Sequence, residues 1–110
     1  MTGLSVHAVD VAAGRPAQGM RVEVYALDPG PAPLAEGALG PNGALDDPIT
    51  SRRLEPGAYE VRLHVGAWLG PERAGILDVI VFRMRLTDPA QHCHLPFKFT
   101  PWGYSVFRGS

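Results

Sequence analysis

The chain has 110 residues, 45% of them apolar and 19% charged, and its 10 Lys and Arg against 11 Asp and Glu leave a formal charge of −1. This length and composition predict one globular domain spanning residues 1–110. The near-neutral balance argues against nucleic acid or an anionic membrane as a partner held mainly by charge. Because there is one cysteine and no apolar stretch of ~18 residues, we expect no intrachain disulfide, no membrane span and a cytoplasmic location.

The 13 Gly and 11 Pro residues favour short strands joined by turns, so the predicted class is all-β. Residues 4–9 and 20–26 alternate apolar and polar side chains with the period of two that is typical of half-buried strands. The segment 13–19 between them predicts a turn. The proline-rich segment 28–33 predicts an exposed loop before a short strand at 34–39.

The second half of the chain continues this pattern. It predicts, in order, a turn at 40–43, a strand at 59–65, a short helical turn at 67–69, a long strand at 77–86, and strands at 92–99 and 104–107. Seven or eight short strands separated by turns favour a sandwich of two antiparallel sheets.

The segment 92–99 carries the most chemical information. Strand alternation sends its apolar side chains to the core face and His92, His94 and Lys98 to the opposite face. That face is either a solvated exterior or a strip whose imidazoles titrate and whose ammonium holds an anion. His-x-His is also a metal-ligand spacing, but no companion cluster of ligands occurs at a recognisable distance, so no metal is expected.

Three other residues carry reactive groups. His7 lies in the middle of its predicted strand, on the face opposite the core side chains of that strand, where a lone histidine is usually exposed. His64 lies on the polar face of its own strand and is interpreted as structural. Cys93 belongs to the core face and is interpreted as a small buried hydrophobe rather than a nucleophile.

Three stretches of the sequence resemble a known family. Residues 4–10 read Leu-Ser-Val-His-Ala-Val-Asp and are followed by Gly-Arg-Pro-Ala at 14–17, residues 92–96 read His-Cys-His-Leu-Pro, and residues 107–110 read Phe-Arg-Gly-Ser. In this order they resemble the opening strand, the His-Tyr-His-Val-Pro strand and the closing Tyr-Arg-Gly-Ser of the 5-hydroxyisourate hydrolase family, the bacterial relatives of transthyretin. The resemblance covers nearly the whole chain.

The resemblance implies a transthyretin-type sandwich assembled as a homotetramer, with active sites in channels at the dimer-dimer interface. It implies a small-molecule substrate and hydrolytic opening of a ring C–N bond in 5-hydroxyisourate, with no cofactor. The residues that it places in catalysis are His7, His94 and Ser110. Those that it places on the substrate are His92, Phe107, Arg108 and Gly109.

Two positions depart from the family pattern. The family's catalytic arginine lies in an Asp-Gly-Arg turn, and here that turn reads Asn-Gly-Ala and places Ala44 at the arginine position. The tyrosine of the closing signature is Phe107. Alanine cannot replace a bidentate guanidinium, so Arg52 or Arg53 from the next segment is the candidate for supplying the charge.

Three functions follow from these residues. The first is cofactor-free hydrolysis of 5-hydroxyisourate or a related ureide. The second is acid-base catalysis on a different cyclic substrate in a specialised biosynthetic pathway, which would explain the loss of the arginine. The third is a non-catalytic transthyretin-like ligand-binding protein, and the retained pair His7 and His94 counts against it because binding alone needs no titrating groups.

Overall fold

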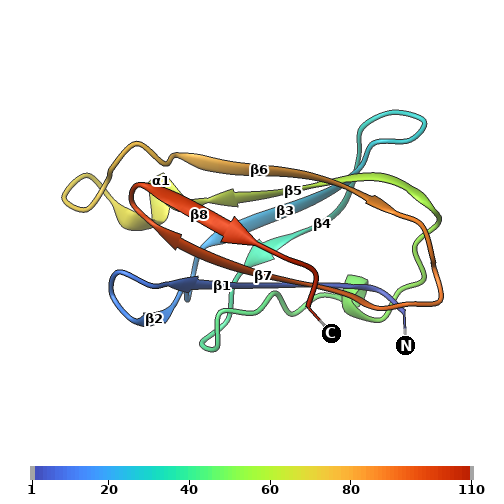
Figure 1. Ribbon diagram of the computed structural model, residues 1–110, viewed down its shortest axis with the longest axis horizontal. Coiled ribbons are helices and arrows are strands. Elements are labelled where there is room, and N and C mark those ends of the chain that lie inside the picture. The colour runs from blue at the N-terminus through green and yellow to red at the C-terminus, as the bar shows by residue number, and fades with distance from the viewer. Residues whose placement is uncertain (1, 110) are drawn as a thin grey trace.

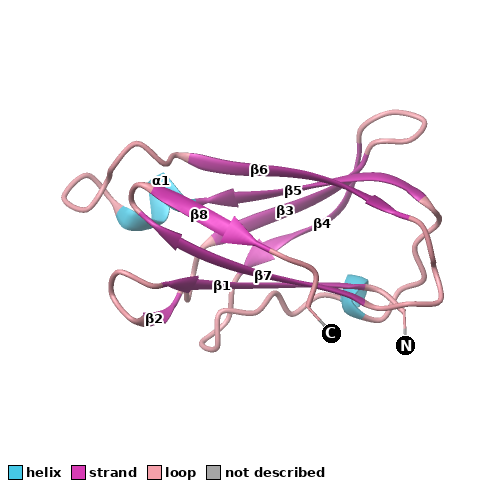
Figure 2. Cartoon of the chain, viewed as in Figure 1, coloured by secondary structure: helices cyan, strands magenta, loops and turns pink. Residues whose placement is uncertain are grey.

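A computed structural model describes residues 2–109 and shows two four-stranded sheets packed face to face (Figures 1 and 2). The first sheet has the strand order β2-β1-β7-β8 and the second β4-β3-β5-β6. The strands are β1 (Leu4–Asp10), β2 (Arg15–Pro16), β3 (Arg21–Ala26), β4 (Ala32–Ala38), β5 (Gly57–His64), β6 (Val79–Leu86), β7 (Cys93–Thr100) and β8 (Gly103–Val106). The sandwich predicted from the sequence is confirmed.

The core lies between the sheets and follows the alternation of the strands. In β1, every second residue from Leu4 to Asp10 is buried, and in β7 the buried positions are Cys93, Leu95, Phe97 and Phe99. The residues between them point to the outer face of the first sheet. A strand with period-two side chains has one face available for the core, so the polar set of β1 and β7 necessarily shares the other face.

One pairing in the first sheet departs from the antiparallel arrangement. Strands β1 and β7 run parallel, with Ser5 opposite His94 and His7 opposite Pro96. Parallel neighbours need a long connection between them. Here that connection is the stretch of chain that forms the second sheet (Figure 1).

The connections differ from their predicted form in two places. The predicted turn at 13–19 contains the two-residue strand β2, and the predicted loop at 28–33 gives way to β4 at Ala32, so Pro33 lies within a strand. Strand β4 is at the edge of its sheet, where proline is tolerated because one side of the strand needs no hydrogen-bond donor.

The helical elements are short. A 3-10 turn lies at Pro48–Thr50, and the predicted helical turn is present as α1 (Val65–Leu69) (Figure 2). Within residues 2–109, no helix has the length and apolar character that a membrane crossing requires.

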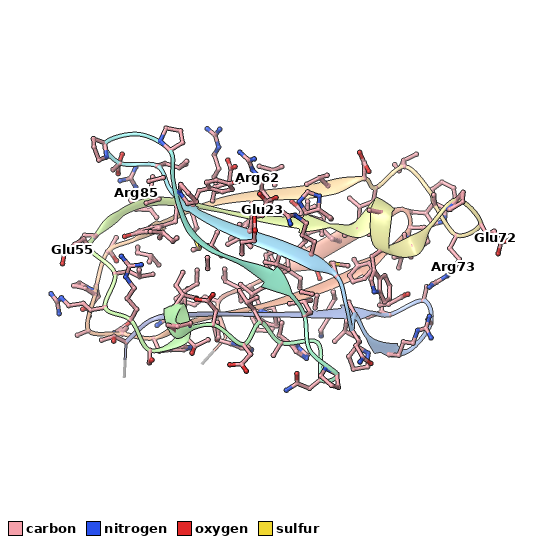
Figure 3. The ribbon with its side chains drawn as sticks, turned by 180° about the vertical axis from the view of Figure 1, so that it is seen from behind. Glu23, Glu55, Arg62, Glu72, Arg73 and Arg85 are labelled. Atoms are coloured by element: carbon pink, nitrogen blue, oxygen red, sulfur yellow. The ribbon has the colours of Figure 1, made fainter. Side chains whose placement is uncertain are left out.

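The outer face of the second sheet is covered by ion pairs. Glu60 is only 2% exposed, because Arg62 donates to it at 2.6 Å and Arg83 donates at 2.9 Å. Glu23 accepts from the Tyr25 hydroxyl at 2.6 Å and lies 2.5 Å from His64 Nε2. Figure 3 shows Glu23 and Arg62 near each other on this sheet. The prediction that His64 has a structural role is consistent with this pairing.

Candidate active site

The parallel pair of strands gathers polar side chains on the outer face of the first sheet. Ser5 and His7 come from β1, His94 comes from β7, and His92 immediately precedes β7. The imidazole rings of His7 and His94 lie 6.4 Å apart between centroids, at an interplanar angle of 31°. The structure therefore brings together the two histidines that the sequence singled out, although they are 87 positions apart in the chain.

The Ser5 hydroxyl lies between two imidazoles. Its Oγ is 2.6 Å from His94 Nδ1 and 2.9 Å from His92 Nε2, and His92 Nδ1 is 2.8 Å from the Thr2 carbonyl oxygen. Both ring nitrogens of His92 are therefore held by protein groups. The resemblance placed His92 on the substrate, but in this arrangement neither of its nitrogens is free to bind one.

His7 is oriented by the turn at residues 40–43, which follows β4. Its Nε2 is 2.7 Å from the Asn42 carbonyl oxygen. A carbonyl only accepts hydrogen bonds, so Nε2 carries the proton and neutral His7 has its lone pair on Nδ1. Gly43 lies in the left-handed region at φ 80°, and a Cβ there would lie 2.6 Å from the Ala8 carbonyl oxygen. Glycine is thus required for the turn to approach β1 this closely.

Ala44, which stands where the family pattern has an arginine, lies directly beside His7. Ala44 pairs with His7 in an isolated antiparallel bridge, so its methyl group occupies the position where a longer side chain would extend past the His7 ring. Arg53 pairs instead with Glu55 at 3.7 Å, and Arg52 is exposed. Among residues 2–109, no hydrogen bond or ion pair joins Arg52 or Arg53 to His7 or His94.

The last described residues lie on different sides of β7: Gly109 packs beside His94, and Arg108 points to the opposite side. The Gly109 amide donates to the His94 carbonyl at 2.7 Å, and a Cβ on Gly109 would lie 2.8 Å from His94 Cδ2, so glycine is needed for the chain end to pack on this ring. Arg108 turns away and donates to the Gln91 Oε1 at 2.9 Å and to the His92 carbonyl at 3.3 Å. Phe107 is exposed. Ser110 lies outside the described residues.

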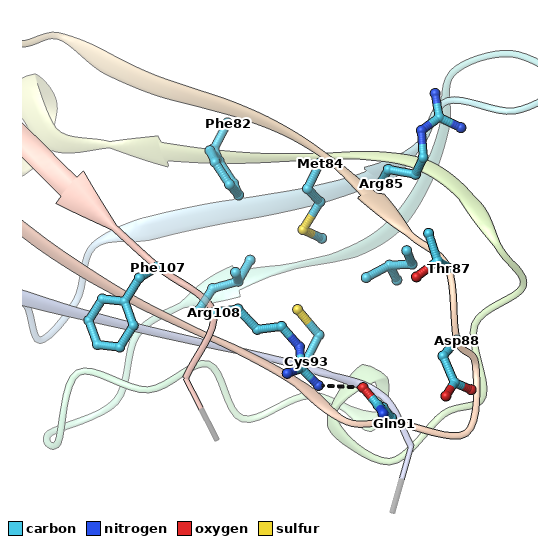
Figure 4. A pocket seen from close by; sticks show the side chains of 11 residues that line it. Phe82, Met84, Arg85, Thr87, Asp88, Gln91, Cys93, Phe107 and Arg108 are labelled. Atoms are coloured by element: carbon cyan, nitrogen blue, oxygen red, sulfur yellow. Dashed lines mark hydrogen bonds between the residues drawn. The ribbon is translucent and has the colours of Figure 1, made fainter.

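Arg108 and Phe107 instead line a cavity of about 200 Å³ on the core side of β7 (Figure 4). The thiol of Cys93 also faces this cavity. Burial raises the pKa of Cys93, and the nearby Arg108 only partly offsets this effect. Cys93 therefore stays a thiol, in agreement with its interpretation as a buried small hydrophobe. Since neighbouring residues of a strand point to opposite faces, this cavity is separate from the histidines.

The electrostatics of the outer face favour a neutral His94. Burial lowers the pKa of His94, and the charges of His7 and His92 lower it further. A neutral imidazole is the form that accepts a proton, so this environment suits a general base near neutral pH. In the described part of the chain, no group of three or more His, Cys, Asp or Glu side chains could hold a metal ion.

Sequence reasoning missed Ser5, Thr2 and Asn42. The alternation of β1 placed Ser5 on the same face as His7, which is the one signal that pointed to it. Its contact with His94 depends on the parallel register of β1 and β7, and the contact of Asn42 depends on the turn at 40–43. Neither the strand pairing nor the docking of a turn can be read from the periodicity of one segment.

The fold and the site together define a transthyretin-type sandwich with a histidine pair on the outer face of one sheet. The model of the HIUase/Transthyretin family matches residues 4–109. The 5-hydroxyisourate hydrolase of Deinococcus radiodurans is 34% identical, with 98% of this chain and 96% of the relative covered. The protein described here therefore belongs to the HIUase/Transthyretin family.

Solved structures agree with this assignment. The 5-hydroxyisourate hydrolase of Klebsiella pneumoniae is 28% identical and superimposes with a TM-score of 0.86 over the whole of both chains. Sea bream transthyretin, solved in complex with thyroxine, is 21% identical and superimposes with a TM-score of 0.85, covering 97% of this chain and 94% of that one. The second likeness shows the shared fold alone.

Proposed function

We propose that this protein is a hydrolase that opens a ring C–N bond of 5-hydroxyisourate or a closely related cyclic ureide. The observation that carries the proposal is the pair His7 and His94, whose rings lie 6.4 Å apart on the outer face of a sheet. The full-length likeness to proteins named 5-hydroxyisourate hydrolase supports the choice of substrate.

The two imidazoles suit the proton transfers of this reaction. Hydrolysis needs a base that takes a proton from the attacking water and an acid that gives a proton to the departing nitrogen. His94 is kept neutral by its surroundings and is the base in this proposal, while His7 faces the same space and is the second acid-base group. Gly109 packs against the His94 ring on this face.

The proposal includes a homotetramer that works in the cytoplasm as one domain of 110 residues. The histidine pair lies on an outer face rather than in a closed cleft of one subunit, so a second subunit facing it would exclude water and complete the site. Light scattering at micromolar concentration is expected to give the mass of four chains. A stable monomer with full activity would contradict this part of the proposal.

The direct test is turnover of freshly generated 5-hydroxyisourate by the purified full chain. We expect measurable hydrolysis by the wild type and loss of at least about a hundredfold in His7→Ala, because general acid-base groups contribute roughly 10² to 10⁴ in rate. Glu36→Ala is the control, since Glu36 is an exposed side chain of β4 on the other sheet. Near-normal turnover by His7→Ala would show that this histidine is structural.

Ala44 supports a second candidate, acid-base catalysis on a different cyclic substrate. The bridge partner of His7 carries a methyl group where the family pattern has a guanidinium, and neither Arg52 nor Arg53 pairs with the histidines. Loss of one charge-stabilising donor costs about 10² to 10³ in rate. This candidate predicts weak 5-hydroxyisourate turnover by the wild type and faster turnover of an uncharged cyclic amide. Rapid 5-hydroxyisourate turnover would exclude it.

A further inference from the structure

The hydrogen bonds behind His94 form a continuous chain across three side chains. It runs from the Thr2 carbonyl to His92 Nδ1 at 2.8 Å, from His92 Nε2 to Ser5 Oγ at 2.9 Å, and from Ser5 Oγ to His94 Nδ1 at 2.6 Å. All three side chains are partly buried, so bulk water competes with these bonds less than it would at an exposed site.

The direction of every bond in this chain follows from its first member. A carbonyl oxygen only accepts, so His92 Nδ1 carries a proton. Neutral His92 then has its lone pair on Nε2, which accepts the Ser5 hydroxyl hydrogen. The Ser5 oxygen has no second hydrogen to donate, so it accepts the Nδ1 hydrogen of His94. His94 is thereby fixed as the Nδ1–H tautomer with its lone pair on Nε2.

We propose that Ser5 and His92 are positioning residues that fix the tautomer of His94 and relay the proton that His94 takes up at Nε2. The proton relay rests on the proposed function, whereas the tautomer of His94 does not depend on any substrate. Ser5 and His92 act through His94 and do not touch the substrate themselves.

The relay balances in both directions. When His94 Nε2 takes a proton from water, its Nδ1 proton passes to Ser5 Oγ while the Ser5 hydroxyl proton passes to His92 Nε2. His94 is then neutral with the proton on Nε2, and the positive charge lies on His92. On return, the proton moves from His92 through Ser5 to His94 Nδ1, and the Nε2 proton of His94 goes to the departing nitrogen.

His92 has one nitrogen that can take up and return a proton. Its Nδ1 is held by the Thr2 carbonyl, and its Nε2 faces the Ser5 hydroxyl. The proton that reaches Nε2 therefore returns by the same path through Ser5 to His94.

The tautomer is tested by long-range ¹H–¹⁵N NMR on the full chain with ¹⁵N-labelled histidine, with the His94 signals assigned by their loss in His94→Gln. We expect a protonated Nδ1 and an unprotonated Nε2 in the wild type and in Ser5→Thr, which keeps the hydroxyl. In Ser5→Ala we expect the proton to shift toward Nε2. Ser105→Ala, an exposed serine of β8, is the matched control and leaves the tautomer unchanged. A wild-type His94 protonated on Nε2 would overturn the inference.

The relay is tested by kinetics of two variants. Ser5→Ala and His92→Gln are each expected to lower kcat at least about tenfold with KM within about twofold, because they impair proton transfer without removing a substrate contact. Glutamine at 92 can accept from Ser5 but cannot take its proton, so His92→Gln keeps the His94 tautomer while kcat falls. Normal kcat in both variants would overturn the relay.

These experiments separate the relay from the proposed function. A wild type that does not hydrolyse 5-hydroxyisourate would contradict the proposed function, and the tautomer of His94 in wild type and Ser5→Ala would still support or overturn the arrangement by itself. A wild type that hydrolyses the substrate, with Ser5→Ala unchanged in both tautomer and kcat, would leave the function standing and remove the relay.

Discussion

His64 and His94 both lie on the outer face of a sheet, yet their partners differ in kind. His64 Nε2 lies 2.5 Å from a carboxylate of Glu23, which also accepts from Tyr25. His94 Nδ1 lies 2.6 Å from the hydroxyl of Ser5. A carboxylate only accepts hydrogen bonds, so it holds the ring nitrogen of His64 as a donor. A hydroxyl both donates and accepts, so Ser5 can pass a proton between its two imidazole neighbours.

The comparison extends to the two faces that hold these histidines. The face of the second sheet is built from ion pairs that include the buried Glu60, and Figure 3 shows Glu23 and Arg62 close together over β3 and β5. The face of the first sheet has imidazoles, a hydroxyl and the small side chain of Ala44. On the second sheet the charged side chains pair with one another. On the first sheet the imidazoles and the hydroxyl stay available for proton transfer.

The largest expected effect comes from removing each histidine in turn. His94→Ala should lower 5-hydroxyisourate turnover at least about a hundredfold, since it removes the proposed general base. His64→Ala should change turnover by less than about twofold, because His64 lies on the opposite sheet and pairs with Glu23. Steady-state kinetics of both purified variants checks this contrast. Equal losses in the two variants would show that neither face is specialised.

The next effect concerns the missing charge. Ala44→Arg should raise 5-hydroxyisourate turnover by as much as ~10², because a guanidinium beside His7 would stabilise negative charge that develops on the substrate. Ala44→Gln is the control of similar length without charge and should give a smaller gain. Turnover that falls in Ala44→Arg would indicate that Arg52 or Arg53 already reaches the site in the assembled protein.

On the second face, Glu60→Gln should lower the free energy of unfolding by about 1–3 kcal/mol, since it weakens two charge-assisted hydrogen bonds at a buried carboxylate. Glu36→Gln is the matched control, because Glu36 is 60% exposed and pairs with Arg21 at 2.7 Å, where an ion pair contributes less than about 1 kcal/mol. Denaturant unfolding measures both. A similar loss in the two variants would contradict the contribution assigned to burial.

The smallest expected effect is on the pH dependence of the free energy of unfolding, in which His94 and Glu60 act over different pH ranges. Burial and the charges of His7 and His92 hold the pKa of His94 below 6.5, so below pH 6.5 the unfolded chain binds more protons at this position. The free energy of unfolding therefore falls as pH decreases through that range. The hydrogen bond from Arg62, with that from Arg83, holds the pKa of Glu60 below 4.5, so its contribution is lost only at lower pH.

Denaturant unfolding from pH 8 to about pH 2.5 resolves these ranges. His94→Gln should flatten the decline below pH 6.5, and Glu60→Gln should flatten the decline below pH 4.5. A wild type whose stability is constant between pH 6.5 and 5 would contradict the His94 assignment.

The sequence by itself determined which side chains share a face. The alternation in β1 and β7 separated the buried Phe97 from the outward His7 and His94, because a strand has a period of two whatever its neighbours are. It also placed the turns and the helical segment at α1, where glycine, proline and loss of alternation mark the chain.

Only the tertiary structure decided which of those side chains meet. The parallel pairing of β1 with β7 placed Ser5 opposite His94. The turn that contains Gly43 brought the Asn42 carbonyl within hydrogen-bond distance of His7. The tertiary structure also buried Glu60 on the outer face of β5, because Arg62 and Arg83 cover it. Contacts between strands far apart in the chain depend on sheet order and register, and these are set by the packing of the whole core rather than by any one segment.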